Sequence, residues 1–276
     1  MKINFTKMHG LGNDFMVIDA INQTISLSEI PIGELSDRHF GVGFDQLLLV
    51  EKAIKDEMDF KYRIFNADGS EVEQCGNGAR CFARFVGKKG LTSKNPIAVE
   101  TQNTDMSLLI NEDDTVKVDM GVPDLRYEED QIIPVNEFRE RYRILREKYP
   151  GCVLSVGNPH YVMVKDDIRN INIRDIAMEI QDSGFFPQGI NVGFMQIDDR
   201  GQIQLRVYER GVGETLSCGS GACAAVIYGI TSGLLDSQVN VNFEHTNSNV
   251  LVEYTANEHV FLSGEAEFVF EGEIEI

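Results

Sequence analysis

The chain has 276 residues, of which 42% are hydrophobic and 25% charged. This composition is typical of a globular protein and excludes a collagen, a coiled coil or a mainly disordered chain. The 44 acidic and 25 basic residues give a net charge of −19, so we predict no nucleic-acid partner, because such a surface repels phosphates. At about 150 residues per domain, the length indicates two domains or one large one.

The beginning of the sequence gives no sign of targeting. Residues 1–15 lack the apolar stretch of a signal peptide, and no run approaches the roughly 18 apolar residues of a membrane span. The five cysteines are too few for a disulfide scaffold, and their number is odd. We therefore predict a cytoplasmic protein with reduced thiols and no membrane contact.

Taken in chain order, the predicted elements are mostly short strands, and the class is α+β or mixed α/β. Two helices have clear boundaries, at 79–86 and 222–230, because Gly90 and Gly233 stand where C-terminal caps are expected. Residues 137–149 fit a helix or a strand. Apolar patterning predicts the other elements: helices at 30–37 and 173–181, and strands at 47–50, 62–65, 97–100, 107–110, 116–119, 162–164, 205–208, 239–243 and 268–276.

One unit occurs twice in the sequence. Residues 62–91 and 205–234 align without a gap at an offset of 143, and each reads as a strand, a Gly-rich loop, the motif CGxGA and a helix. A shorter trace, Gly-Asn at 12–13 and 157–158, recurs at an offset of 145. Offsets close to half the chain length indicate two homologous halves. The identical pairs are Arg63/Arg206, Glu71/Glu214, Cys75/Cys218, Gly76/Gly219, Gly78/Gly221, Ala79/Ala222, Gly90/Gly233 and Leu91/Leu234.

The repeated cysteines, Cys75 and Cys218, stand immediately before Gly-x-Gly at a helix start. A helix N-terminus stabilises a thiolate, and a cysteine there can have a pKa of roughly 3.5–7.5. We therefore predict that this pair is reactive. The other three cysteines are interpreted as small buried hydrophobic residues, with Cys81 and Cys223 inside the two helices and Cys152 outside them.

Three familiar cysteine and glycine motifs fit this sequence poorly. Residues 219–224 match the dinucleotide pattern G-x-G-x-x-A, but a loop separates them from the preceding strand and the other half breaks the pattern. The spacings C-x5-C and C-x4-C suit neither a zinc site nor a C-x-x-C redox pair. We therefore predict no metal and no cofactor.

Two matched thiols suit the inversion of a carbon stereocentre. One base removes the proton from one face of the carbon, one acid delivers a proton to the other face, and the roles exchange in the reverse direction. The two helix N-termini would present N–H groups to the substrate carboxylate, where negative charge develops. These local groups would hold an anionic ligand against the acidic field of the whole molecule.

The sequence resembles the diaminopimelate epimerase family over essentially its whole length. The motifs that carry the resemblance are HGLGNDF (9–15), FDQLL (44–48), FNADGSEVEQCGNGARC (65–81), GNPH (157–160), GINVGF (189–194) and YERGVGETLSCGSGACA (208–224). The resemblance implies an α+β fold of two pseudo-symmetric domains, each a mixed strand barrel around a central helix, with the active site in the interdomain cleft. The expected halves are 1–122 plus 264–276, which holds Cys75, and 123–263, which holds Cys218.

The same resemblance implies an isomerase. The expected reaction is the cofactor-independent epimerisation of LL-2,6-diaminopimelate to the meso form, in lysine and peptidoglycan precursor biosynthesis, and the expected assembly is a homodimer. Cys75 and Cys218 would be the acid–base pair, with His160 assisting Cys75 and Glu209 assisting Cys218, since a neighbouring base can take up the thiol proton. Outside the family motifs, a lone histidine beside a strand such as His160 is more often a structural side chain, and Glu209 could be a rim carboxylate in a solvent-exposed loop.

Further residues are expected from the resemblance to bind the substrate, which carries a zwitterion at each end. Asparagines offer both donors and acceptors, and Arg210 can bind the distal carboxylate at two points. The expected substrate-binding residues are Asn13, Gln46, Asn66, Gly76, Asn77, Asn158, Asn191, Glu209, Arg210, Gly219 and Ser220.

Two other interpretations stay open at this point. A racemase of similar fold that acts on proline or hydroxyproline would bind a monocarboxylate, which has no distal group for Arg210. A thiol redox or binding protein would use Cys75 and Cys218 as a switchable pair and would form a stable disulfide without isomerase activity. We also expect that oxidation of the epimerase links these two cysteines reversibly, provided that their Cα atoms come within about 7 Å.

Overall fold

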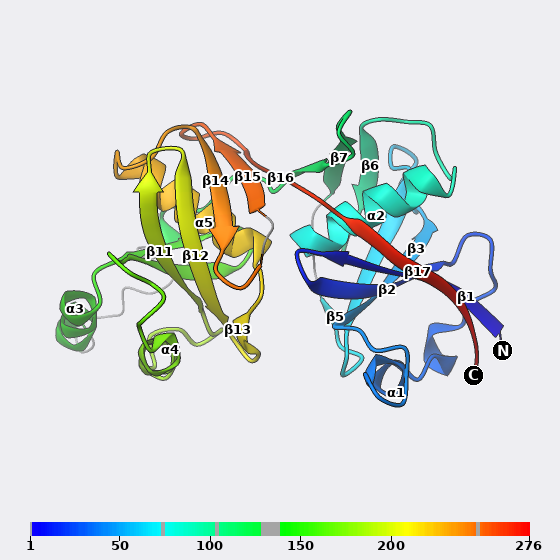
Figure 1. The fold of residues 1–276 in the computed structure, drawn as a ribbon, viewed down its shortest axis with the longest axis horizontal. Helices are drawn as coiled ribbons and strands as arrows, with labels where there is room; N and C mark the ends of the chain where they lie inside the picture. The colour runs from blue at the N-terminus through cyan, green and yellow to red at the C-terminus, as the bar shows by residue number, and fades with distance from the viewer. Residues whose placement is uncertain (1, 73–74, 103–104, 128–138, 247–248) are drawn as a thin grey trace. The chain divides into compact units, whose positions relative to one another are not determined.

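The computed structural model describes residues 2–72, 75–102, 105–127, 139–246 and 249–276. The chain divides into two compact units: unit 1 is Met1–Asp119 with Ser263–Ile276, and unit 2 is Met120–Leu262. In each unit, strands gather around one long helix (Figure 1), so the predicted class of two similar α+β halves is confirmed. Within the described ranges, no helix is both long and apolar enough to cross a membrane.

A mixed sheet forms most of unit 1. Its strands are β1 (Lys2–Gly10), β2 (Asn13–Asp19), β3 (Gln46–Lys52), β4 (Phe60–Asn66), β5 (Glu71–Val72), β6 (Ile97–Glu100), β7 (Met106–Ile110), β8 (Val116–Asp119) and β17 (Glu267–Glu275). They pair in the order β17, β1, β2, β3, β4, β6, β7, β8, with β5 also on β4. The β2–β3 and β4–β6 pairs are parallel, and the others are antiparallel.

The central helix of unit 1 is α2 (Gly76–Lys88). It contacts β1, β2 and β3 as well as β7 and β8, so the sheet curves around it. Phe82 packs edge-on against Phe60 and Tyr62 from β4, with ring centroids 5.9 and 5.5 Å apart. The helix is followed by Gly90 at φ 67°, a conformation that favours glycine after a helix end. A short helix, α1 (Ile32–Ser36), and a 3-10 turn (Leu27–Glu29) precede β3.

Unit 2 repeats this arrangement. Its strands are β9 (Cys152–Ser155), β10 (Pro159–Val164), β11 (Asn191–Asp199), β12 (Gln202–Glu209), β13 (Gly213–Thr215), β14 (Gln238–Phe243) and β15 (Asn249–Tyr254), and its helices are α3 (Arg139–Lys148), α4 (Ile173–Gln181) and α5 (Gly219–Thr231). The strand β16 (Val260–Gly264) begins in unit 2 and ends in unit 1. The central helix is α5, which contacts β9, β10, β11, β12 and β15.

Most strand pairings of unit 1 recur in unit 2. The parallel pairs β10–β11 and β12–β14 match β2–β3 and β4–β6. The antiparallel pairs β11–β12, β12–β13 and β14–β15 match β3–β4, β4–β5 and β6–β7. The duplication that the sequence indicated is therefore present in the topology.

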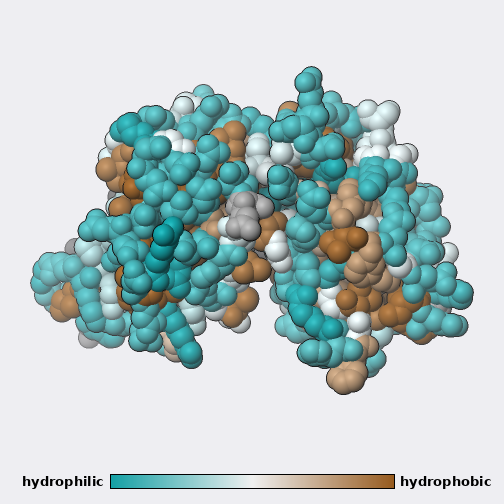
Figure 2. Space-filling view, viewed as in Figure 1, coloured by the Kyte–Doolittle hydropathy of each residue, from teal (hydrophilic) through white to brown (hydrophobic). Residues whose placement is uncertain are grey.

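Burial follows the strand pattern in both units. One apolar cluster of unit 2 joins α3 and α4 to β10 and β11, and it includes Tyr142, Leu145, Ile173, Ile180 and Phe194. A cluster in unit 1 joins β1, β2, β3 and α1. Hydrophilic residues cover most of the visible face of each unit, with smaller apolar areas between them (Figure 2).

Most predicted elements are present, but several bounds differ. Both long helices begin three residues before the predicted starts at 79 and 222, because the glycines of CGxG are already helical. The predicted helix at 30–37 is shorter, at Ile32–Ser36. Of the ambiguous segment 137–149, residues 137–138 lie outside the described ranges, and Arg139–Lys148 is helical.

Candidate active site

Cys75 is the N-cap residue of α2, with an extended backbone at φ −144°. Its Sγ donates to Asn13 Oδ1 over 3.6 Å, and Asn77 Nδ2 donates to the same oxygen over 3.3 Å. Asn13 begins β2, and Asn77 lies in the first turn of α2. The thiol therefore stands at a helix N-terminus, where unpaired N–H groups and the helix dipole favour negative charge.

The amide of Asn13 is held in one orientation. Its Nδ2 donates to Asp45 Oδ2 over 3.1 Å, and a carboxylate can only accept. The Oδ1 atom of Asn13 is therefore the one that faces Cys75. Asp45 is itself bound by Arg38 Nη2 at 2.7 Å. Arg38 and Lys7 also bind Asp14. Burial alone would raise the pKa of Asp14, but the bonds from these two cations lower it well below its usual value.

Two further polar residues of unit 1 meet across neighbouring strands. Gln46 and Asn66 are register partners in β3 and β4, and Gln46 Nε2 donates to Asn66 Oδ1 over 3.0 Å. Gln46 is also paired with Phe15 of β2. A row of side chains therefore crosses three strands, beside the end of the sheet that carries Asn13.

A buried arginine that the sequence analysis did not single out supports Asn77. Arg80 is completely buried, and its Nη2 donates to Asn77 Oδ1 over 2.9 Å. Its Nε donates to the backbone carbonyl of Glu265 over 3.1 Å. Cys223 is aligned with Arg80 in the repeat. The buried cation is therefore present in α2 and is replaced by a cysteine in α5.

Cys218 is the N-cap residue of α5, with φ −137°, and only 6% of it is exposed. Its Sγ lies 3.6 Å from Ser220 Oγ, and it also hydrogen-bonds the carboxylate of Glu209. The structure thus brings together Cys218, Ser220 and Glu209. The contact between Glu209 and Cys218 is the one that the family resemblance implied. Gly219 and Ser220 form the first turn of the helix.

Glu209 ends β12 and is partly buried. Burial raises the pKa of this carboxyl, while hydrogen bonds from Thr215 and Cys218 lower it, and the net shift is upward. Thr215 Oγ1 donates to Glu209 Oε1 over 2.6 Å. Thr215 was not among the predicted residues. The sequence shows only that a hydroxyl follows Glu209 by six residues. Whether that hydroxyl reaches the carboxylate depends on the register of the two strands.

His160 lies in β10 and is completely buried. Burial, with a smaller contribution from the charge of Arg210, lowers the pKa of His160 to about 3. Its Nε2 lies 3.0 Å from Asn158 Oδ1 and 3.1 Å from Ser220 Oγ. With Asn158 Oδ1 as the acceptor, Nε2 carries the proton and Nδ1 is the unprotonated nitrogen. In the part of the chain that the structure describes, Nδ1 has no hydrogen-bond partner.

Asn191 and Arg210 complete the polar set of unit 2. Asn191 begins β11, is the register partner of His160, and its Oδ1 accepts from the Arg210 backbone N–H over 3.0 Å. The Arg210 guanidinium donates to the Gln188 carbonyl over 2.6 Å through Nη1. Gly189, at φ 72°, leaves room for this side chain, because a Cβ there would stand 3.2 Å from Arg210 Cδ.

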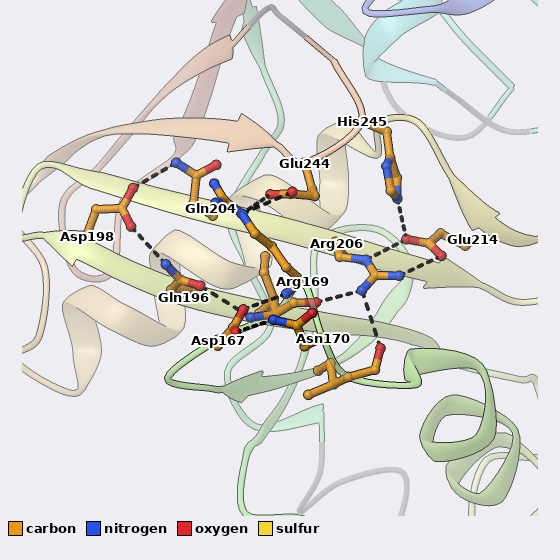
Figure 3. A network of polar contacts seen from close by, with 12 residues as sticks. Asp167, Arg169, Asn170, Gln196, Asp198, Gln204, Arg206, Glu214, Glu244 and His245 are labelled. Atoms are coloured by element: carbon orange, nitrogen blue, oxygen red, sulfur yellow. Dashed lines mark hydrogen bonds and ion pairs between the residues drawn. The ribbon is translucent and has the colours of Figure 1, made fainter.

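A salt bridge occurs at the same place in both units. Arg63 binds Glu71 through Nε and Nη2, each at 2.8 Å. Arg206 binds Glu214 in the same way, at 2.7 and 3.0 Å. In unit 2, Glu214 also accepts from His245 (Figure 3). These pairs fasten the short strands β5 and β13 to β4 and β12, just before each helix N-terminus.

The predicted site residues therefore form two sets, one in each unit. Unit 1 holds Cys75, Asn13, Gln46, Asn66, Gly76 and Asn77, and unit 2 holds Cys218, Asn158, His160, Asn191, Glu209, Arg210, Gly219 and Ser220. His160 and Cys75, predicted to act together, belong to different units, so their pairing stays a prediction. The two sets differ: where unit 1 has Phe15 and Asn66, unit 2 has His160 and Glu209.

Comparison with known proteins gives a consistent picture. The model of the diaminopimelate epimerase family matches residues 5–125 and 152–269. Proteins named diaminopimelate epimerase are 52% identical over 276 residues in Vesicomyosocius okutanii subsp. Calyptogena okutanii (strain HA) and 50% identical over 279 residues in Nitrosomonas europaea, each covering 100% of both chains. A solved hydroxyproline epimerase from Agrobacterium vitis is similar in fold, with a TM-score of 0.70 at 12% identity over 99% of this chain and 92% of that chain.

Proposed function

The chain belongs to the diaminopimelate epimerase family, and from that premise we propose that it is an isomerase that converts LL-2,6-diaminopimelate to the meso form without a cofactor. This places it in the synthesis of lysine and peptidoglycan precursors. The observation that carries the proposal is the pair of matched helix N-termini, each with a cysteine as its N-cap residue.

The reaction transfers one proton at each face of the α-carbon. One cysteine, as a thiolate, takes the α-proton, so that a C–H bond breaks and an S–H bond forms. The electron pair left on carbon delocalises into the α-carboxylate. The other cysteine then gives its thiol proton to the opposite face of the carbon. Cys75 and Cys218 exchange these roles in the reverse reaction.

The helix N-termini supply the electrostatic part of the mechanism. Backbone N–H groups of Gly76 and Asn77 in one unit, and of Gly219 and Ser220 in the other, are the donors for the substrate carboxylate. Preorganised donors of this kind stabilise the negative charge that develops there without reorganising during the reaction. The mechanism requires the two N-termini to face one substrate molecule.

Each thiol is proposed to work with a neighbouring base. Glu209 is supported as the partner of Cys218 by their hydrogen bond. His160 is proposed as the partner of Cys75, and its support is a ring nitrogen, Nδ1, that is buried and not hydrogen-bonded within the described ranges. A base next to a thiol takes up its proton and leaves the nucleophilic or basic thiolate.

The distal end of the substrate is assigned to Arg210. Its guanidinium uses Nη1 to bind the Gln188 carbonyl, which fixes the plane of the group, and a fixed guanidinium suits a carboxylate geometrically. The amides of Asn13, Gln46, Asn66, Asn158 and Asn191 are proposed to bind the polar groups between the two ends. Proline and hydroxyproline lack a distal carboxylate, and this distinguishes the proposal from a racemase of those substrates.

Hydrogen exchange tests the proposal directly. The purified protein, with diaminopimelate in D2O and no added cofactor, is expected to incorporate deuterium at the α-carbon. Proline and hydroxyproline should show no exchange under the same conditions. An absence of exchange with diaminopimelate, or exchange only with proline, would contradict the proposal.

Cysteine variants test the two-thiol mechanism. Cys75→Ala and Cys218→Ala are each expected to abolish epimerisation, because each removes the proton handler of one face. Cys152→Ala is the matched control and should keep the wild-type rate. Its Sγ donates to the Val153 carbonyl oxygen over 3.8 Å, and Cys152 is not one of the predicted site residues.

Assembly and location remain part of the proposal. The family resemblance supports a homodimer in the cytoplasm. Light scattering of the purified protein should give twice the mass of one chain, which is 31.0 kDa. A monomeric mass at micromolar concentration would contradict the dimer and leave the proposed reaction untouched.

A further inference from the structure

We propose that Thr215 is a positioning residue that orients the carboxylate of Glu209 toward Cys218. The inference rests on the proposed function, because it gives Glu209 its role through that reaction. Thr215 touches neither reacting atom in this assignment and acts through Glu209 alone.

The contact between the two side chains is short and specific. Thr215 Oγ1 donates to Glu209 Oε1 over 2.6 Å, a distance typical of a hydroxyl donating to a carboxylate. Thr215 is paired with Val207 across β12 and β13. Val207 and Glu209 are two residues apart in one strand, so their side chains and that of Thr215 share a face. The bond is therefore a diagonal cross-strand contact, fixed by register.

The duplicated unit shows where the hydroxyl is needed. In unit 1, Val72 occupies the position of Thr215 and is paired with Ile64 across β4 and β5. Asn66 there occupies the position of Glu209. The hydroxyl is thus present in the half that has a carboxylate and replaced by a methyl in the half that has an amide. Threonine and valine have nearly the same shape, so packing of this hairpin does not demand the hydroxyl.

The hydrogen bond from Thr215 makes the two oxygens of the Glu209 carboxylate different. With Oε1 occupied by the threonine hydroxyl, the carboxylate cannot rotate freely, and its remaining lone pairs are directed to other donors, of which the Cys218 thiol is one. The hydroxyl also favours the ionised carboxylate, which burial disfavours. Both effects keep Glu209 able to accept a proton.

The position of Thr215 is itself well supported. Its neighbour Glu214 is clamped to β12 by the two-point bond with Arg206, and His245 binds Glu214 Oε1 at 2.9 Å (Figure 3). Arg206 further binds the Ile168 carbonyl through Nη1. The strand that carries the hydroxyl is thereby anchored next to its partner strand.

The test replaces the hydroxyl by the residue that the other half already uses. Thr215→Val is compared with Thr215→Ser, which restores a hydroxyl, and with Thr231→Val, a matched control whose hydroxyl binds the Ile227 carbonyl near the end of α5. Two readouts are taken across pH: kcat/KM for diaminopimelate, and the rate of alkylation of each cysteine by iodoacetamide, followed by mass spectrometry.

Thr215→Val is expected to move the acid limb of kcat/KM to higher pH by about one unit, so that activity on that limb falls about tenfold. The alkylation midpoint of Cys218 should also rise, because a carboxylate that is no longer oriented toward Cys218 takes up the thiol proton less readily. Cys75 is the internal control and should keep its midpoint. Thr215→Ser should restore both readouts, and Thr231→Val should change neither.

The two proposals fail separately. An absence of α-proton exchange in the wild-type protein would overturn the proposed function, and the alkylation comparison would still decide the role of Thr215. An unchanged Cys218 midpoint in Thr215→Val, an equal shift of Cys75, or no recovery in Thr215→Ser would overturn the inference.

Discussion

Burial determines the protonation states of individual residues in unit 2. His160 is completely buried and has a pKa of about 3, chiefly because the protein interior disfavours its charged form. Glu209 has a raised pKa for the same reason. His160 is therefore kept neutral, while Glu209 can hold a proton more readily than an exposed carboxylate. These states are set by packing around the strand ends.

The low pKa of His160 makes a prediction about stability. The unfolded chain has an ordinary histidine pKa near 6.5, so below that pH it binds more protons than the folded chain. Stability is therefore fully present above about pH 6.5 and is lost as pH falls toward 3. Between pH 7 and pH 5, His160 should cost about 2 kcal/mol of unfolding free energy.

Urea unfolding of wild type and His160→Gln at the two pH values measures this cost. The wild-type protein should lose about 2 kcal/mol more than the variant between pH 7 and pH 5. Equal losses in the two proteins would mean that His160 does not have the depressed pKa.

The sequence predicts candidate site residues but not the contacts that hold them in place. Cys75 and Cys218 were found because the repeat marks them, and the family motifs supplied His160 and Glu209. Asp45, Arg80 and Thr215 were not found, because each acts through a partner that is distant in sequence or diagonal across a strand pair. Such contacts depend on register, which local patterning does not define.

At the scale of elements, the second glycine of each CGxGA motif lets a helix N-terminus approach a strand. A Cβ on Gly78 would stand 2.6 Å from the Tyr62 hydroxyl, and one on Gly221 would stand 3.0 Å from Val207 Cγ2 and 3.3 Å from Cys218 Sγ. The helix starts were predicted three residues late because glycine is a poor helix former. Close packing overrides that propensity here.

Gly221→Ala should therefore damage both stability and activity. The added methyl should lower the unfolding free energy by about 1–3 kcal/mol through overpacking, and it should lower kcat by displacing the Cys218 thiol. Thermal unfolding and steady-state kinetics measure the two effects.

The matched control is Gly33→Ala in α1, where the nearest atom to the new Cβ is the Ala67 carbonyl oxygen at an ordinary 3.6 Å. It should leave both quantities close to wild type. Wild-type kinetics in Gly221→Ala would show that Cys218 tolerates the displacement.

At the scale of the whole molecule, the excess of negative charge opposes compactness. A net charge of −19 produces self-repulsion in the folded state, and salt screens it over about 10 Å at 0.1 M. Raising NaCl from about 0.02 to 0.3 M should therefore raise the unfolding temperature. Choline chloride at the same ionic strength should act equally. A rise with sodium alone would indicate specific cation binding instead of screening.

The two units also differ in how the chain builds them. Unit 2 is the continuous segment Met120–Leu262, whereas unit 1 combines Met1–Asp119 with Ser263–Ile276. A fragment of residues 120–262 should therefore fold alone, with amide exchange protection like that of the same segment in the full chain. Exchange throughout the fragment at the rate of an unfolded chain would show that unit 2 depends on unit 1.

The pairing of β17 with β1, from Lys2 opposite Glu275 to His9 opposite Glu267, has a consequence for synthesis on the ribosome. The half that is translated first lacks its last strand until the whole of unit 2 has been made. The second half can thus be complete while the first still exposes one edge of β1, and an exposed strand edge is a template for pairing with other chains. The order of completion is the reverse of the order of translation, and the nascent chain is most open to misassembly at its oldest strand.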